Sequence, residues 1–405
     1  MKKNDENPYR KIAETFIKAF EDSDEIELDS IEIAIDKLEF LLSSITRQII
    51  TPTIMPSQIA KPIEIPKLKF EKPKMVWPGK IIEVEIGATR SMGGTRDKTY
   101  IIGGEKAPPF YFFEEPEIVM PHKPIFALDI FDMKISLPKA VRMFYGEDVL
   151  NDPAEWARIA VEKFNADMIT LHLVSTDPNV KNTSPLEAAK IVENVLQAVK
   201  VPICVGGSGN PEKDVEVFAK ISEIAEGERI LINSLNLDMD LKKVLEPIKK
   251  YGHVVIDFSP MDLDKARQLN RKVYDYLPKN MIVIDMNCAG IGYGLEYGYT
   301  ATQRARLAAL RGDEELQHPL VAGVSNAWAA REAWIKMDPL WGPKEIRGPI
   351  WELLTGLCML LAGADYFMTV CPTTPTTLKE FVEYIYGEKA FSKEELYNWV
   401  SAKIR

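Results

Sequence analysis

The chain has 405 residues, of which 46% are hydrophobic and 27% charged, and its 50 basic and 60 acidic side chains give a formal net charge of −10. This length predicts one large domain with a smaller appended segment. The negative charge argues against a nucleic-acid partner, whose phosphates would have to be neutralised by Lys and Arg. No apolar stretch reaches the roughly 18 residues of a membrane helix, and the polar start MKKNDENPYRK is unlike a signal peptide, so we expect a cytoplasmic protein without a membrane partner.

The first segment, residues 1–78, is predicted to be a helical segment followed by a proline-rich arm. Apolar residues recur every three or four positions over residues 8–20 and 29–49, which predicts two helices that pack on a surface. From Thr51 to Pro78 the composition shifts to proline, which indicates an extended arm laid along this protein or another one. Such an arm favours assembly with other chains.

Residues 79–120 are predicted to form a β-hairpin region. KIIEVEIGATR and KTYIIGGE have alternating apolar positions on either side of a glycine-containing turn at residues 91–97, which is typical of a hairpin. A phosphate-binding loop is the alternative, but a strand rather than a helix follows the turn. We expect the hairpin to close the mouth or the base of the next domain.

Residues 121–390 repeat one unit eight times: a short apolar run, a polar turn and an amphipathic helical stretch. The near-continuously apolar runs are typical of buried parallel strands, and about 260 residues for eight units predicts a (β/α)8 TIM barrel within the α/β class. A doubly wound open sheet is the competing fold. A C-terminal helical tail is expected over residues 391–405. The eight runs are PIFALDIF, ADMITLHLVS, VPICVGGSG, RILINSLN, HVVIDFSP, NMIVIDMN, PLVAGVS and ADYFMTVC.

Three predicted helices have clear start signals at Asp152-Pro153, Ser184-Pro185 and Asn210-Pro211. The first residue of each pair supplies an N-cap acceptor, and proline fits the first helical position, where no amide hydrogen is needed.

The cysteines and histidines argue against a metal site in this chain. Cys204, Cys288, Cys358 and Cys371 are scattered rather than clustered in CxxC-type motifs, so no iron–sulfur cluster is expected, and Cys204 and Cys371 are predicted to be small buried residues. The four histidines show no HExxH or paired-His spacing, which argues against a catalytic metal.

Ligands of (β/α)8 barrels bind at the carboxyl ends of the strands, and here those ends are rich in polar side chains. Such a ring could bind a polar heterocycle through hydrogen bonds. Each of these residues could instead cap a loop or satisfy a buried amide. His172 could be either a buried core histidine or a catalytic base. The polar residues are Asp129, Asp132, His172, Ser175, Ser208, Asn210, Asn233, Ser234, Asn236, Asp257, Ser259, Asp285, Asn287, Ser325 and Asn326.

Two long loops near the mouth carry aromatic residues. The stretch after the sixth strand interleaves Gly290, Gly292 and Gly294 with Tyr293 and Tyr297, so its backbone could approach a flat ligand, although an ordinary loop is the alternative. The seventh loop and the stretch after it concentrate tryptophan, which predicts a large apolar contact with a macrocyclic cofactor or a partner subunit. These tryptophans are Trp328, Trp334, Trp341 and Trp351.

Along essentially its whole length the chain resembles the delta subunits of archaeal acetyl-CoA decarbonylase/synthase complexes, the counterparts of the small subunit of the corrinoid iron–sulfur protein. The resemblance lies in VEIGATRSMGGTRDKTYIIGGE, FALDIFDM, VGGSGNPEKD, LINSLNLD, IDMNCAGIGYGLEYGYT and VSNAWAAREAW. It implies a barrel that pairs with a gamma subunit bearing the [4Fe-4S] cluster and most of the corrinoid site. It also implies that the acetyl-CoA synthase and CO dehydrogenase components of the complex are partners of this chain. The pair would carry methyl groups in archaeal one-carbon metabolism.

The resemblance leaves two functions open. In the first, the chain is an accessory subunit that caps a corrinoid shared at the interface and supplies no catalytic residue or metal ligand. In the second, the barrel itself binds a methyl-tetrahydropterin and transfers its methyl group, because LINSLN resembles the strand ends of pterin-binding methyltransferases; Asp257 or Asp129 would then help to protonate the pterin. We favour the first. The residues expected to bind the cofactor are Ser208, Asn210, Asn233, Asn236, Asp257, Asn287, Tyr293, Ser325 and Asn326.

Overall fold

A computed structural model describes residues 75–109 and 120–390. The expected N-terminal helices, most of the proline-rich arm and the C-terminal helical tail lie outside these residues. Contacts within the chain divide it into two compact units, Met1–Pro73 and Lys74–Arg405. All of the described residues belong to the second unit.

Eight parallel strands form a closed barrel, which confirms the (β/α)8 prediction and excludes the open doubly wound sheet. The last strand pairs with the first, with Tyr366 opposite Ile125 and Thr369 opposite Leu128. Each strand coincides with one of the eight apolar runs. The strands are β3 (Ile125–Phe131), β4 (Met168–His172), β5 (Ile203–Gly206), β6 (Leu231–Leu235), β7 (Val254–Phe258), β8 (Ile282–Asp285), β9 (Leu320–Gly323) and β10 (Tyr366–Thr369).

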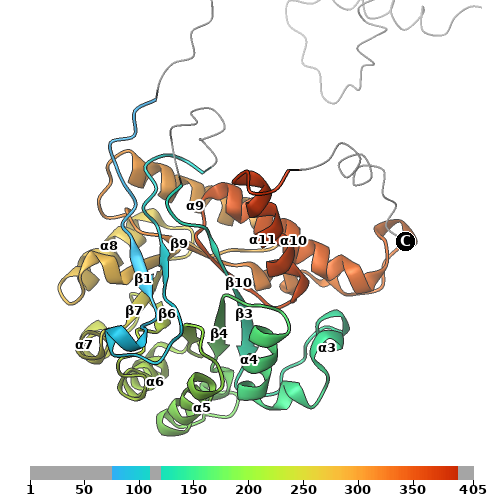
Figure 1. Cartoon of the computed structure of the whole chain (residues 1–405), viewed down its shortest axis with the longest axis horizontal. Coiled ribbons are helices and arrows are strands. Elements are labelled where there is room, and N and C mark those ends of the chain that lie inside the picture. Colours follow the sequence, from blue (N-terminus) through green and yellow to red (C-terminus); the bar gives the residue numbers. More distant parts are fainter. Residues whose placement is uncertain (1–74, 110–119, 391–405) are drawn as a thin grey trace, which may run out of the picture. The chain divides into compact units, whose positions relative to one another are not determined.

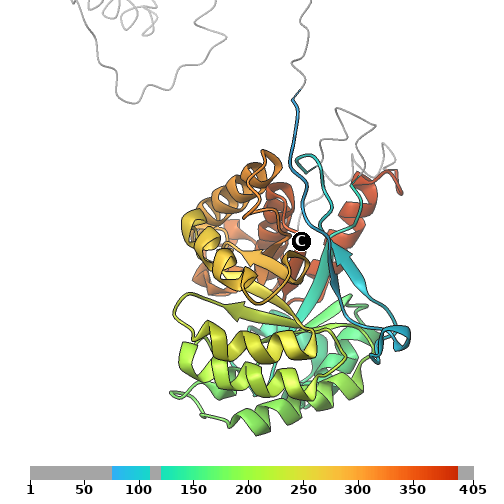
Figure 2. The ribbon, with the colours of Figure 1, turned by 90° about the vertical axis from the view of Figure 1, so that its left-hand side faces the viewer.

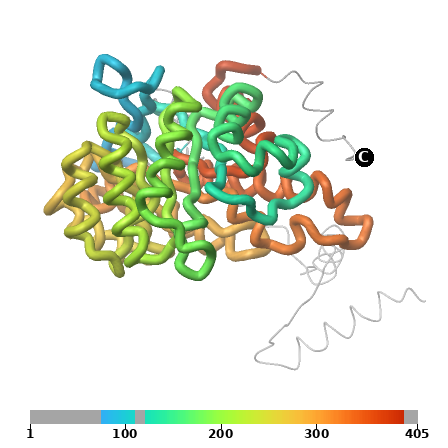
Figure 3. The backbone as a smooth tube through the Cα atoms, turned by 90° about the horizontal axis from the view of Figure 1, so that it is seen from below, coloured from blue at the N-terminus to red at the C-terminus, as the bar shows by residue number. Residues whose placement is uncertain are grey.

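Helices surround the barrel, as Figure 1 shows, and Figure 3 shows successive helical coils side by side. The α-helices are α3 (Lys139–Tyr145), α4 (Pro153–Glu162), α5 (Pro185–Ala198), α6 (Pro211–Ile224), α7 (Leu241–Tyr251), α8 (Leu263–Tyr274), α9 (Leu295–Leu310), α10 (Lys344–Ala362) and α11 (Thr373–Ile385). Short 3-10 turns are η1 (Arg90–Met92), η3 (Val149–Asn151), η4 (Val174–Thr176), η5 (Lys279–Met281), η6 (Val324–Ala329), η7 (Arg331–Ala333) and η8 (Pro339–Trp341).

The three predicted helix starts have the expected caps. Asp152 accepts hydrogen bonds from the amides of Ala154 and Glu155, and Asn210 accepts one from the amide of Lys213. Ser184 and Glu187 form a reciprocal capping box at the start of α5. Each cap satisfies amide groups that the first helical turn leaves without an intrahelical partner.

The predicted β-hairpin is present as β1 (Val84–Ile86) and β2 (Tyr100–Ile102), and it closes the amino-terminal base of the barrel rather than its mouth. Its backbone amides at Ile82, Gly87 and Asp97 donate to carbonyls just before β9, β6 and β5. Val84, Ile86 and Ile102 pack into the same apolar cluster as the residues that fill the barrel interior. In Figures 1 and 2 the hairpin lies against one end of the barrel.

The glycine-containing turn of the hairpin is held by a buried arginine. Arg96, which is 3% exposed, donates from Nε to Glu228 Oε2 at 2.7 Å, and its other nitrogens donate to carbonyls at the end of α5 and the start of β5. Thr95 donates to the same carboxylate at 2.7 Å. The turn therefore anchors the hairpin to the base, which favours the structural interpretation of its glycines over phosphate binding.

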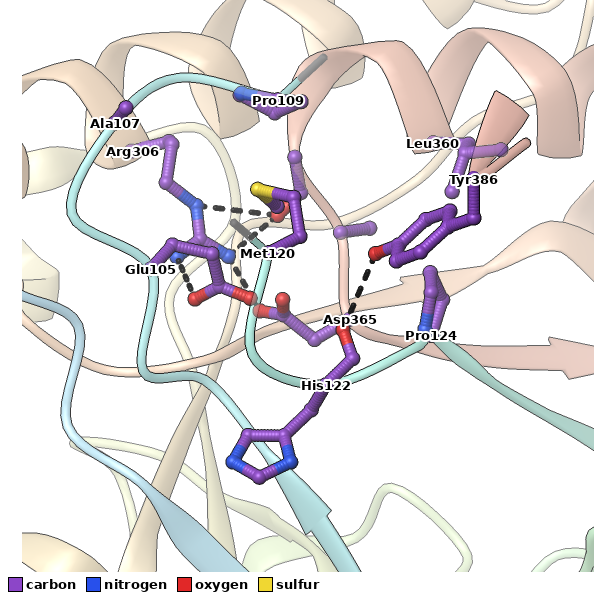
Figure 4. Close-up of a pocket in the computed structure, with 12 residues that line it drawn as sticks. Glu105, Ala107, Pro109, Met120, His122, Pro124, Arg306, Leu360, Asp365 and Tyr386 are labelled. Atoms are coloured by element: carbon purple, nitrogen blue, oxygen red, sulfur yellow. Dashed lines mark hydrogen bonds and ion pairs between the residues drawn. The ribbon is translucent and has the colours of Figure 1, made fainter. Parts of the chain in front are cut away.

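A second buried arginine fixes the chain that leads from the hairpin to β3 (Figure 4). Arg306 of α9 pairs with Glu105 at 3.2 Å and with Asp365, and it donates to the carbonyl of Gly363. These groups line a cavity of only about 20 Å³ near the amino ends of β3 and β10. Because the guanidinium is already fully engaged, this cavity is a structural junction.

Candidate functional site

Alternation along the strands decides which side chains face the barrel mouth. Residues such as Ala127, Met168, Cys204 and Val283 fill the apolar interior, and the residues two or four positions further along each strand face inward nearer the carboxyl end. This layer is polar and contains two glycines. Its members are Asp129, His172, Gly206, Asn233, Phe258, Asp285 and Gly323.

Asp129 is the centre of one side of the mouth. Its carboxyl group is 1% exposed and accepts a hydrogen bond from Ser325 Oγ at 2.6 Å, while His172 Nε2 lies 3.4 Å from the same oxygen, Oδ2. Among the described residues, Asp129 Oδ1 has no hydrogen-bond partner. His172 is stacked on Phe131, with ring centroids 5.2 Å apart, so its ring plane is fixed. The three polar groups form a connected, oriented cluster.

The two inward-facing glycines leave room between these polar groups. A Cβ atom on Gly206 would lie 3.0 Å from His172 Nδ1 and 3.5 Å from Asn233 Nδ2. A Cβ on Gly323 would lie 3.2 Å from Asn326 Nδ2 and 3.6 Å from the methyl group of Met368. Asn233 Nδ2 in turn lies 3.8 Å from Met368 Sδ. The mouth therefore brings Asp129, His172, Asn233, Ser325, Asn326 and Met368 around the space that the glycines leave.

Asp285 faces the mouth from β8. It accepts a hydrogen bond from the backbone amide of Asn287 at 2.7 Å, yet burial raises the pKa of its carboxyl group to about 6. Asn287 itself has a positive φ of 69°, which lets the loop turn back toward this carboxylate. A carboxyl group of this pKa can hold or release a proton near neutral pH.

The remaining predicted cofactor-binding residues at the mouth have local roles in the loops. Ser208 donates from Oγ to Asp214 at 2.8 Å, and Asn210 caps α6. Asn236 accepts a hydrogen bond from the amide of Asp238, and Asn326 donates to the carbonyl of Cys288 at 2.8 Å. These contacts support the capping alternative for Ser208, Asn210 and Asn236. Of the predicted residues, Asn233, Ser325 and Asn326 converge on the mouth.

Asp257 lies elsewhere. It shares a strand face with Val255, which packs in the outer cluster between barrel and helices, whereas Ile256 packs in the barrel interior. Asp257 is fully buried, neither oxygen has a hydrogen-bond partner among the described residues, and burial raises its pKa well above the usual range. Its position therefore corrects its assignment to the mouth: it faces the helices and lies away from any ligand held there.

The predicted aromatic residues divide into a structural and an exposed set. Trp328 packs on Gly348, where an added Cβ would lie 2.1 Å from its ring, and Trp351 donates to the carbonyl of Ile291. Tyr293 is 60% exposed, and Trp334 and Trp341 are about half exposed. We call the exposed set Tyr293, Tyr297, Trp334, Leu340, Trp341 and Leu354 the apolar rim.

Sequence reasoning did not identify Gly206, Gly323 or Met368 as part of the site, nor the pairing of His172 with Asp129. The glycines belong to apolar runs in which only the strand register shows that they face inward. Within residues 75–109 and 120–390, no group of three or more His, Cys, Asp or Glu side chains could hold a metal ion. In the same residues, no helix is long and apolar enough to cross a membrane.

Comparison with known proteins gives concordant results. The family model for the CO dehydrogenase/acetyl-CoA synthase delta subunit matches residues 83–340. The chain is 46% identical to the acetyl-CoA decarbonylase/synthase complex subunit delta of Archaeoglobus fulgidus, over 87% of this chain and 81% of that protein. It is 44% identical to the subunit of the same name from Methanocaldococcus jannaschii, over 90% of each chain.

Among solved structures, similar folds include dihydropteroate synthases. The enzyme from Xanthomonas albilineans aligns with 14% identity and a TM-score of 0.44, over 65% of this chain and 93% of that one. The enzyme from Thermus thermophilus aligns with 16% identity and a TM-score of 0.42, over 65% of this chain and 94% of that one.

Proposed function

The chain belongs to the CO dehydrogenase/acetyl-CoA synthase delta-subunit family, and from this membership we propose that it pairs with a gamma-type corrinoid iron–sulfur subunit and covers the corrinoid with its barrel mouth. In this role it supports methyl transfer to the acetyl-CoA synthase centre of the complex. The observation that carries the proposal is the family match, because residues 83–340 contain most of the mouth and most of the apolar rim.

The mouth and rim fit a corrinoid held mainly by another subunit. A corrinoid is flat and bordered by amide side chains, so it needs hydrogen-bonding groups near apolar surface. Asn233, Ser325 and Asn326 supply amide and hydroxyl groups, and Tyr293 and Trp334, on the loops after β8 and β9, supply exposed aromatic surface.

In this role, the residues of this chain would control access to the corrinoid. When bound, the corrinoid supplies a cobalt centre that accepts and donates a methyl group. The linked side chains of Asp129, Ser325 and His172 would present polar groups to the corrinoid, and the apolar rim would exclude water from the contact. The barrel thus positions and shields a reactive centre.

The test is to mix the purified full-length chain with the gamma subunit of the same organism and follow size exclusion and corrinoid absorbance. We expect a one-to-one complex, with little corrinoid on this chain alone. A Tyr293→Ser, Trp334→Ser variant should bind the gamma subunit at least about tenfold more weakly, because exposed aromatic residues dominate many interfaces. Leu361→Ser is the matched control: Leu361 is 50% exposed but lies at the end of α10 near the base. Stoichiometric corrinoid on the isolated chain would reverse the assignment.

One observation supports the alternative function, in which the barrel itself binds a methyl-tetrahydropterin. Asp129 Oδ1 is buried without a partner among the described residues, and Asn233 Nδ2 lies across Gly206 from His172 Nδ1. An open carboxylate oxygen near an amide and an imidazole suits a polar heterocycle such as a pterin, for which Asp129 and His172 would supply a proton to the leaving nitrogen.

Calorimetric titration with a methyl-tetrahydropterin tests this second function. If the barrel binds the pterin, Asn233→Ala should weaken binding, whereas Asn236→Ala, which removes only a turn contact, should not. No heat of binding to the full-length chain, alone or with the gamma subunit, would eliminate it.

A further inference from the structure

Arg347 is a buried cation whose charge has no counterpart among the described residues. It lies in the first turns of α10 and is 5% exposed. Its Nη2 donates to the carbonyl of Ile335 at 2.9 Å, but Nε and Nη1 are buried without a hydrogen-bond partner in the described part of the chain. No carboxylate forms an ion pair with it there.

The other two buried arginines show that this state is exceptional. Arg96 pairs with Glu228 and Arg306 pairs with Glu105 and Asp365, and both donate to several carbonyls as well. A buried charge that lacks a partner is strongly destabilising, whereas a buried pair is tolerated. The described part of the chain therefore satisfies two of its buried arginines and leaves the third open to a group from outside these residues.

Arg347 lines a pocket of about 190 Å³ beside the mouth. Trp341 and Trp351 line it as a packed aromatic pair, with ring centroids 6.4 Å apart, and Ile346, Ile350 and Leu354 add aliphatic surface. The hydrogen bond from Trp351 Nε1 to the carbonyl of Ile291 ties this pocket to the loop after β8. Ligand pockets commonly measure about 300–1,000 Å³, so this one suits the end of a larger molecule rather than a whole organic ligand.

The surroundings indicate that the larger molecule is a protein. Trp341 and Leu354, which line the pocket, are 51% and 43% exposed, and the neighbouring Leu340 is 95% exposed; all three belong to the apolar rim. Exposed Trp and Leu around a buried Arg is the composition of an interface centre, where charged residues other than Arg are scarce.

We propose that Arg347 anchors a protein partner by pairing with an aspartate or glutamate side chain that enters the pocket beside the paired rings of Trp341 and Trp351. The proposal rests on the proposed function, which makes the gamma-type subunit the partner. A carboxylate is the group that matches the guanidinium, because it accepts two parallel N–H bonds. The first turn of α10, with no side-chain cap, adds a further favourable potential for a negative group.

The test is isothermal titration of the purified gamma subunit into the full-length chain and its Arg347→Met variant, with Arg304→Met as control. Arg304 is also on a barrel helix but is exposed. We expect Arg347→Met to weaken binding by about tenfold or more, the effect of losing hydrogen bonds to a charged group, and Arg304→Met to leave it unchanged. The thermal midpoint of the free chain should not fall in Arg347→Met, because the variant removes an unpaired buried charge. Trp341→Ala, a surface change, should also weaken binding and keeps the test informative should Arg347→Met not fold.

The outcomes separate the two proposals. If the unaltered chain does not bind the gamma subunit, both the proposed function and the Arg347 anchor fail. If the unaltered chain binds and Arg347→Met binds equally well, only the anchor fails. A lower thermal midpoint in Arg347→Met with unchanged binding would show that Arg347 serves the fold itself and would also overturn the anchor. Inorganic phosphate at millimolar concentration gives a further outcome. If it stabilises the unaltered chain but not Arg347→Met, while both bind the gamma subunit equally well, Arg347 binds a small anion and the anchor is overturned.

Discussion

Glu352 offers a quantitative test of the electrostatics at the carboxyl end of β10. Its side chain lies on α10 and is fully buried, and its carboxylate accepts hydrogen bonds from the amides of Val370 and Cys371 and from Thr374 Oγ1, at 2.8, 3.1 and 2.6 Å. It thereby fixes the turn from β10 into α11. Burial outweighs these hydrogen bonds and raises the pKa of Glu352 from 4.5 to about 7.

The raised pKa has a definite sign in the pH dependence of stability. The folded chain binds the Glu352 proton more tightly than the unfolded chain, so the stabilising contribution is fully present below pH 4.5 and is lost as pH rises through about 7. The difference of about 2.5 between the two pKa values corresponds to about 3 kcal/mol, most of it lost between pH 5 and pH 8. A glutamine at this position does not titrate.

The assay is urea unfolding of the unaltered chain and of Glu352→Gln at pH 5 and pH 8, with exposed Glu216→Gln on α6 as control. The unaltered chain should lose about 2 kcal/mol more than Glu352→Gln between the two pH values, because all other titrating groups are common to both. Glu216→Gln should behave as the unaltered chain does. Equal pH dependence in the unaltered chain and Glu352→Gln would show that the three donors hold the carboxylate ionised and that burial does not dominate.

Three further predictions concern packing and polar contacts. Arg306→Met should lower the free energy of unfolding by about 3–5 kcal/mol, because it leaves Glu105 and Asp365 buried without their shared cation; a loss under 1 kcal/mol in urea would contradict this. Ser184→Ala should cost about 1 kcal/mol by removing the α5 capping box, measured in the same way, and a neutral effect would show that the cap is dispensable. Gly348→Ala should lower the thermal midpoint: the overpacking cost of about 1–3 kcal/mol against the Trp328 ring exceeds the gain of about 1 kcal/mol in helix propensity, and a raised midpoint would show that the ring moves freely.

The strands and helix starts could be predicted because their causes are local. A run such as PLVAGV is apolar on both faces of its strand, as a barrel covered by helices requires, and Ser184 with Glu187 carries a capping box in four consecutive residues. Barrel closure was confirmed by the pairing of β10 with β3, which joins residues more than two hundred positions apart. The presence of eight repeated units predicted the pairing of the last strand with the first, although neither strand carries a local signal for it.

The orientation of the polar strand-end residues could not be predicted with the same success. In VVIDFS every residue before Asp257 is apolar, so the sequence offers no alternation to show which face the carboxylate takes. The structure puts Asp257 toward the helices and Asp129 and Asp285 toward the mouth, a difference set by strand register. Arg347 carried one unused signal: it stands in a largely apolar helix with no acidic residue three or four positions away.

Among the described residues, the two ends of the barrel differ in how their buried arginines are satisfied, and this difference supports a binding role for the carboxyl end. At the base, the buried Arg96 and Arg306 are paired with carboxylates and carbonyls, and the hairpin fills the remaining apolar space. At the carboxyl end, Asp129 Oδ1 and two nitrogens of Arg347 are buried without partners among the described residues. Since a buried polar group without a partner costs about 1–3 kcal/mol and a charged group more, the guanidinium left open at the carboxyl end favours binding of a partner there.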